Sequence, residues 1–149
     1  MVATQNLKRQ ESRQKSETLK QKILERIARK RTDVFFRKDF KDLAGYDQVG
    51  RALRQLVREG QLVKIGYGLY ARAKRSSLSG KTIPNKTLPK LATEALNRLN
   101  VKVSPSQSNR DYNEGRTTQV PTGRVIGVGQ RISRKIGYNG KYVSFEYSR

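Results

Sequence analysis

The sequence of 149 residues contains no cysteine and no histidine. Without cysteine, the chain can form no disulfide, no thiolate nucleophile and no cysteine-ligated zinc site. The absence of histidine removes the commonest general base and the commonest nitrogen ligand for metals. The 12 acidic residues are scattered and form no obvious metal cluster. We therefore expect a protein that is not an enzyme and that uses neither a metal ion nor a cofactor.

Long hydrophobic runs are also missing. No apolar run approaches the roughly 18 residues of a membrane span, and the N-terminus lacks the apolar segment of a secretory signal. Hydrophobic residues make up 34% of the chain, which is below the usual share for a globular protein. We expect a modest core, some disordered chain, no membrane association and a cytoplasmic, nucleoid-associated location in a bacterium.

Positive charge is abundant, with 33 Lys and Arg against 12 Asp and Glu and a net charge of +21. The excess is spread along the chain: residues 1–31 hold ten basic and three acidic side chains, residues 32–80 ten and five, and residues 81–149 thirteen and four. Such a chain repels itself unless a polyanion neutralises it. DNA or RNA is the expected counterpart; a role in solubility, or an anionic membrane surface, is the alternative.

The first part of the chain alternates helical patterns with a short extended piece. Residues 1–17 are polar and predict a basic arm that is disordered or helical. Apolar residues at helical spacing predict a first helix over residues 18–31. After an extended "DVFF", the stretch "KDFKDLAG" predicts a short second helix that ends at Gly45.

A third helix, residues 48–59, is capped by Asp47 in this interpretation and carries an inward apolar stripe. The stripe consists of Val49, Ala52, Leu53 and Leu56. The stretches "QLVKI" and "LYARA" then predict two strands joined through Gly-Tyr-Gly. Three helices followed by a hairpin are the order of a winged helix-turn-helix, which we expect over residues 18–75.

The remaining chain predicts a second unit. Residues 76–87 are rich in Ser, Lys and Gly and indicate a linker. Residues 88–149 predict a small α+β domain: one amphipathic helix, then strands at "VKVSP", "RVIGVG", "RISRKI" and "KYVSFEY", mostly antiparallel. The turn "GYNG" joins the last two strands, and we expect Val143, Phe145 and Tyr147 to face inward. The whole chain is thus expected to be α+β.

A recognition helix needs an inward apolar stripe and an outward polar stripe, and the third helix offers both. Arginine can bridge guanine O6 and N7, and glutamine can pair with adenine N6 and N7. An ordinary solvated helix face is the alternative interpretation. The expected contacts of this helix are Gln48, Arg51, Arg54, Gln55 and Arg58, and those of the hairpin, or wing, are Lys64, Tyr67 and Arg72.

The arm and the first helix carry a further series of basic residues. Such an arm could enter a minor groove or follow a phosphate backbone, or it could be an unstructured solvating tail. Both interpretations stay open. The series is Lys8, Arg9, Arg13, Lys15, Lys20, Lys22, Arg26, Arg29, Lys30 and Arg31.

Four stretches resemble the AbiEi-type antitoxin family of bacterial winged-helix regulators and a related family of uncharacterised proteins. They are "FFRKDFKDLAGYDQVGRALRQLVREG", "QLVKIGYGLYA", "TTQVP" at Thr117 to Pro121, and "RKIGYNGKYVSF", which together cover roughly residues 18–147. The resemblance implies sequence-specific binding of double-stranded DNA near the protein's own promoter, and hence autorepression. It also implies neutralisation of a co-encoded nucleotidyltransferase-like toxin.

By this resemblance, the C-terminal unit supplies antitoxin activity or extra DNA contacts, with Arg124, Arg131, Arg134 and Lys135 as candidates. Further backbone contacts would come from Arg29, Lys30 and Arg31. The arm at residues 1–17 is not part of the family pattern, and the second unit is short. The alternatives to a DNA-binding repressor are an RNA-binding or ribosome-associated basic protein, and an antitoxin that acts only by binding its toxin. The sequence leaves the oligomeric state open.

Overall fold

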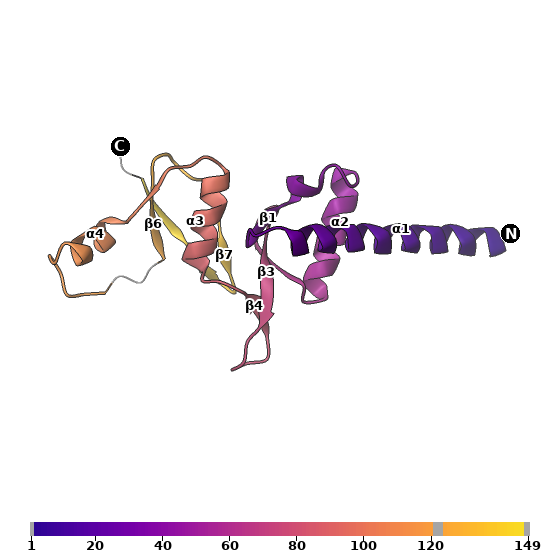
Figure 1. The fold of residues 1–149 in the computed structure, drawn as a ribbon, viewed down its shortest axis with the longest axis horizontal. Coiled ribbons are helices and arrows are strands. Elements are labelled where there is room, and N and C mark those ends of the chain that lie inside the picture. The colour runs from indigo at the N-terminus through magenta and orange to yellow at the C-terminus, as the bar shows by residue number, and fades with distance from the viewer. Residues whose placement is uncertain (1, 121–123, 148–149) are drawn as a thin grey trace.

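The computed structural model describes residues 2–120 and 124–147 and shows an α+β fold, as the sequence predicts (Figure 1). The N-terminal half contains α1 (Val2–Arg29), β1 (Val34–Phe36), the 3₁₀ helix η1 (Arg37–Phe40), α2 (Tyr46–Arg58), β2 (Leu62–Gly66), β3 (Leu69–Arg75) and β4 (Thr82–Pro84). The C-terminal half contains α3 (Leu88–Arg98), β5 (Val103–Ser104), α4 (Gln107–Asn113), β6 (Val125–Val128), β7 (Gly137–Tyr138), β8 (Lys141–Tyr142) and β9 (Ser144–Tyr147). None of the helices in the described residues combines the length and apolar composition that a membrane span needs.

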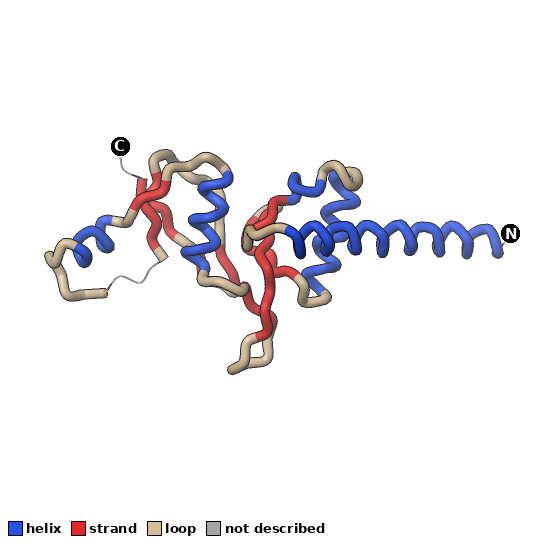
Figure 2. Tube along the Cα trace, in the orientation of Figure 1, coloured by secondary structure: helices blue, strands red, loops and turns tan. Residues whose placement is uncertain are grey.

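A central antiparallel sheet has the strand order β1-β3-β2, with β4 paired to the far end of β3. Successive side chains of a strand point to opposite faces, and here both faces are covered, so β1, most of β2 and the first half of β3 are apolar. The strands lie between α1 and α2 on one side and α3 on the other (Figure 2).

Each face of the sheet has its own core. The α1–α2 core contains Ile23, Ile27, Phe35, Phe40, Val49, Ala52, Leu53, Leu56, Leu62 and Tyr70. The α3 core combines Val34, Phe36, Val63, Ile65, Leu69 and Ala71 of the sheet with Leu91, Ala92, Ala95, Leu96, Val101, Ile126, Val128, Ile136 and Val143. The C-terminal half is therefore packed directly onto the first sheet. Residues 76–87, predicted as a linker, include β4, so this segment is partly a strand of that sheet.

The predicted arm is helical throughout its described residues, because α1 is a single helix from Val2 to Arg29. Its C-terminal half packs on α2 through Ile23 and Ile27. Its N-terminal half projects away from the rest of the molecule (Figure 1), and every described side chain between Leu7 and Thr18 is exposed. This half of α1 is therefore free to contact another molecule.

The prediction of a short second α-helix is wrong. The segment forms the single 3₁₀ turn η1, followed by a hydrogen-bonded turn at residues 41–43. At the start of η1, the carboxylate of Asp39 accepts a hydrogen bond from the Phe36 N–H at 2.8 Å, which holds the chain in a tight turn. Gly45 does not end a helix. It is the N-cap of α2, and its N–H donates to Oε1 of Gln48 at 3.2 Å. Asp47, predicted as the cap, lies inside the first turn.

The C-terminal half differs from its predicted strands in two places. Residues 131–136 form no strand, because this segment crosses the β2–β3 turn: the Lys135 carbonyl lies 2.9 Å from where a β-carbon of Gly66 would be. The predicted last strand is split into β8, which pairs with β7, and β9, which pairs in parallel with β6. Tyr147, expected to face inward, is 42% exposed.

Candidate nucleic-acid interface

The outward face of α2 is the centre of the candidate site. The predicted inward stripe is buried as expected, with Val49, Ala52, Leu53 and Leu56 all in the core. On the opposite side Gln48, Arg51, Arg54 and Arg58 are exposed and Gln55 is half-buried. Within the described chain, the three arginine side chains make no hydrogen bond or ion pair. Their guanidinium groups are therefore available to a ligand.

The turn between β2 and β3, Tyr67–Gly68, lies beside the N-terminal end of α2. Tyr67 is 76% exposed and Tyr46, the first residue of α2, is 59% exposed. The phenol group of Tyr67 raises the pKa of the neighbouring Tyr46 above its ordinary value, and partial desolvation adds to the shift. Two exposed hydroxyl groups thus lie together at the end of α2.

Arg37, which sequence reasoning missed, fixes the position of this helix end. Its Nε and Nη2 donate to the Tyr46 carbonyl at 2.9 and 2.6 Å, and its guanidinium lies 3.5 Å from the centre of the Tyr46 ring. It also lies 3.8 Å from the Asp47 carboxylate. The one sequence signal for such a contact is Gly50 inside a helical pattern, because a glycine there indicates a close approach by a neighbour.

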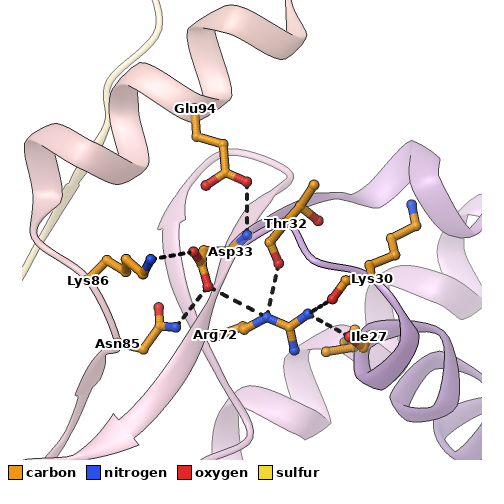
Figure 3. Close-up of polar contacts among 8 residues, drawn as sticks. All are labelled: Ile27, Lys30, Thr32, Asp33, Arg72, Asn85, Lys86 and Glu94. Atoms are coloured by element: carbon orange, nitrogen blue, oxygen red, sulfur yellow. Dashed lines mark hydrogen bonds and ion pairs between the residues drawn. The ribbon is translucent and has the colours of Figure 1, made fainter.

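Arg72, predicted as a wing contact, points instead to the end of α1 (Figure 3). Its guanidinium donates to the backbone carbonyls of Thr32 at 2.9 Å, Ile27 at 2.6 Å and Lys30. The last carbonyls of a helix have no partner inside the helix, and an arginine satisfies them while complementing the negative end of the helix dipole. Arg72 therefore caps the end of α1, and its guanidinium is engaged inside the molecule.

Asp33 joins this cap to the start of α3. Its carboxylate lies 3.7 Å from Arg72 and 3.3 Å from Lys86, and it accepts from the Asn85 amide at 2.9 Å. Its backbone N–H donates to Glu94 of α3 at 2.8 Å (Figure 3). Burial opposes the charge of Asp33, but Asn85, Lys86 and Arg72 outweigh it and hold the pKa of Asp33 below its usual range.

The remaining predicted contacts divide into two groups. Arg134 and Lys135 lie at the β2–β3 turn: Nη1 of Arg134 donates to the Tyr67 carbonyl at 3.1 Å, and the Lys135 carbonyl faces Gly66. The structure therefore brings these two residues to the turn that flanks the N-terminal end of α2. The others are Lys64, exposed on β2; Arg29, exposed beside Glu25; Lys30, half-buried; Arg31 and Arg124, exposed; and Arg131, exposed over the Tyr147 ring.

A groove of about 420 Å³ runs between α1 and α2. We call it the α1–α2 groove; its lining residues are Lys15, Ser16, Thr18, Leu19, Lys22, Leu43, Ala44, Gln48, Arg51, Ala52 and Gln55. Three of these residues are basic and none is acidic. The groove adjoins the outward face of α2, because Gln48, Arg51 and Gln55 belong to both surfaces. Sequence reasoning predicted the basic residues on each helix but not that they would share a groove.

The carboxylates are largely used inside the molecule. Asp39 accepts two hydrogen bonds from Arg98, at 2.7 and 2.6 Å. Asp42 accepts two from Arg26, at 2.6 and 2.7 Å, and Glu59 holds the buried Lys20 at 2.6 Å. Few acids are thus left to neutralise the exposed cations of α1 and α2.

Comparisons with known proteins give one result. No curated protein sequence and no solved structure matches the chain. Residues 19–148 match a family described as a family of unknown function (DUF6088). The matched residues start within α1, after its projecting half. Because the match covers most of the sequence, the chain belongs to this family of unknown function, DUF6088.

Proposed function

We propose that the protein is a sequence-specific DNA-binding transcriptional regulator that acts as a repressor. The observation that carries the proposal is the outward face of α2, where Arg51, Arg54 and Arg58 are exposed and make no hydrogen bond or ion pair with the residues that the structure describes. A solvated helix face would serve solubility equally well. The basic α1–α2 groove on one flank and the exposed tyrosines on the other favour a binding surface.

In this proposal, α1 to β3 form a winged helix-turn-helix, with η1 and α2 as the helix pair and the β2–β3 turn as a short wing. The order of the elements supports this assignment. Helix α2 would enter the major groove, which is about 12 Å wide and admits one helix. Arg51 and Arg58 are separated by about 10 Å along the helix axis, which corresponds to about three base pairs.

The two flanks of α2 have complementary roles. Arginines on the outward face would bridge guanine O6 and N7, while Gln48 and Gln55 would pair with adenine. The Tyr46 and Tyr67 hydroxyls would donate to phosphates on one side of the groove, where Lys64 and Lys135 add charge. Such backbone contacts fix the register of a protein on the duplex without reading its sequence.

The proposal extends to the biology that the resemblance to AbiEi-type antitoxins implies. A repressor bound at its own promoter would occlude RNA polymerase, and the protein would work at the nucleoid in the bacterial cytoplasm. Neutralisation of a co-encoded nucleotidyltransferase-like toxin would fall to the C-terminal half. This part rests on the four sequence stretches; one of them ends at Pro121, which lies outside the described residues.

Selection of bound duplexes from a random DNA pool at moderate salt tests the proposal. We expect a common site of a few base pairs to be enriched, with guanines opposite the arginines. A pool that stays random after several rounds would contradict sequence-specific binding. Loss of the bound DNA to an excess of structured RNA would favour an RNA-binding protein instead.

A further inference from the structure

The projecting helix α1 carries lysines at a regular spacing. Lys8, Lys15 and Lys22 are each seven residues apart, and seven residues are close to two turns of an α-helix. Because α1 is continuous from Val2 to Arg29, the three side chains lie along one side of the helix. We call them the lysine stripe. Lys15 and Lys22 line the α1–α2 groove, so the stripe leads out of the groove along the projecting half.

The groove is basic on both walls. Lys15 and Lys22 come from α1, and Arg51 comes from α2. None of the three forms an ion pair or hydrogen bond with another described residue. Two lysines and one arginine that face one another across the groove match a chain of phosphates better than a compact anion, since the lysines continue beyond the groove to Lys8.

We propose that the α1–α2 groove receives the sugar–phosphate backbone of a DNA duplex, and that the lysine stripe follows this backbone away from the bases read by α2. The proposal rests on the DNA-binding function proposed above and adds a second, sequence-independent contact to it. The stripe spans about 21 Å along the helix axis, which equals the rise of about six base pairs. One helix would thus extend the site well beyond the base pairs under α2.

Of the acidic residues on α1, Glu11 is the one whose charge opposes phosphate binding by the lysine stripe. Glu17 is engaged with Lys20 at 3.2 Å, and Glu25 faces Arg29 at 3.9 Å. Glu11 lies between Lys8 and Lys15 on the same side of the helix, three residues from one and four from the other. It has no partner within the described chain. Removal of this one charge should therefore strengthen binding to any duplex.

The salt dependence of binding tests the proposal. Each phosphate contact contributes about 0.9 to the slope of log Kobs against log salt concentration on B-DNA. We expect the double variant Lys15→Gln, Lys22→Gln to lower the slope by about 1.8 on a duplex of random sequence. The matched control is Lys74→Gln, Lys90→Gln, which removes two exposed lysines beside α3 and should leave the slope unchanged. Thermal unfolding of both variants checks that each is folded.

The outcomes separate this inference from the proposed function. If the two double variants have the same slope, the α1–α2 groove is not a site for the DNA backbone. The salt dependence then reflects only the net charge of the protein. Unchanged or weaker binding of the Glu11→Gln variant would also overturn the stripe. Because the duplex is of random sequence, the test holds even if the selection from a random pool finds no preferred site. Wild-type protein that binds duplex RNA of equal length more tightly than the DNA would contradict both proposals.

Discussion

The guanidinium of Arg37 lies against α2 at Gly50, where a β-carbon would come within 2.2 Å of its Nη2. The glycine is therefore what allows Arg37 to reach the Tyr46 carbonyl across the helix. Without this contact, the end of α2 and the tyrosine pair would lose their common anchor. Arg37 is thus a positioning residue for the face that we propose to bind DNA.

A double-mutant cycle tests this relationship. In wild-type protein, Gly50→Ala should destabilise the fold by about 1 kcal/mol, because displacement of Arg37 costs charged hydrogen bonds that exceed the gain in helix propensity. In an Arg37→Ala background, the same substitution should stabilise the fold by roughly 0.5–1 kcal/mol. Urea unfolding measures both. The same effect in both backgrounds would show that the two residues are independent.

The pair of Asp39 and Arg98 predicts a defined response to acid. Burial opposes the charge of Asp39, but two hydrogen bonds from Arg98 and one from the Phe36 N–H hold the pKa of Asp39 below its usual range. Arg26 lowers the pKa of the exposed Asp42 to about 2. The unfolded chain, with Asp pKa values of about 3.9, binds more protons than the folded chain in this range. The free energy of unfolding should therefore be constant above about pH 5 and fall as the pH drops from about 4 toward 2.

The variant Arg98→Gln should leave the Asp39 carboxylate buried without its partner. We expect a loss of about 3 kcal/mol at neutral pH. Because burial without Arg98 raises the pKa of Asp39, protonation of this carboxyl relieves the penalty, and the difference from wild type should shrink as the pH falls. Arg26→Gln, which unpairs an exposed carboxylate, serves as the control and should cost much less at neutral pH. A difference in the free energy of unfolding between wild type and Arg98→Gln that stays the same from neutral pH down to about pH 3 would refute the role of this pair.

Arg72 and Lys64 lie on the same hairpin but have different expected roles. Arg72 stabilises the fold, whereas Lys64 is an exposed cation that can contact DNA. Arg72→Ala removes three bonds to the end of α1 and should lower the free energy of unfolding by about 2 kcal/mol. It should leave the salt dependence of DNA binding unchanged. Lys64→Ala should alter stability by less than about 0.5 kcal/mol and should reduce the slope of that salt dependence by about 0.9. If Arg72→Ala instead reduces the slope of the salt dependence, and Lys64→Ala instead lowers the free energy of unfolding, Arg72 is the wing contact.

Local patterns predicted part of the fold well. The stripe Val49, Ala52, Leu53 and Leu56 is buried as predicted, and the hairpin at Asn139–Gly140 forms with φ of 55° and 77° at its two central residues. Both features depend on a few adjacent residues, whose helical spacing or left-handed backbone preference is visible in the sequence.

Features that depend on distant contacts could not be predicted in this way. The parallel pairing of β9 with β6 joins segments separated by about twenty residues of chain, and no local period encodes it. The role of Arg72 could not be predicted because its partners are backbone carbonyls at the end of α1 and just after it, which carry no sequence signature. Arg37 and the α1–α2 groove were missed for the same reason: each arises only when α2 packs against another element.

The central claim is that arginines on the outward face of α2 read base pairs. The most direct measurement is the ratio of affinities for the selected duplex and for a scrambled duplex of equal length, in wild type and in Arg54→Ala. We expect Arg54→Ala to weaken binding of the selected duplex by about 1–3 kcal/mol and to affect the scrambled duplex far less, so that the ratio falls. An Arg54→Ala variant that weakens both duplexes equally, with an unchanged ratio, would contradict base readout by α2.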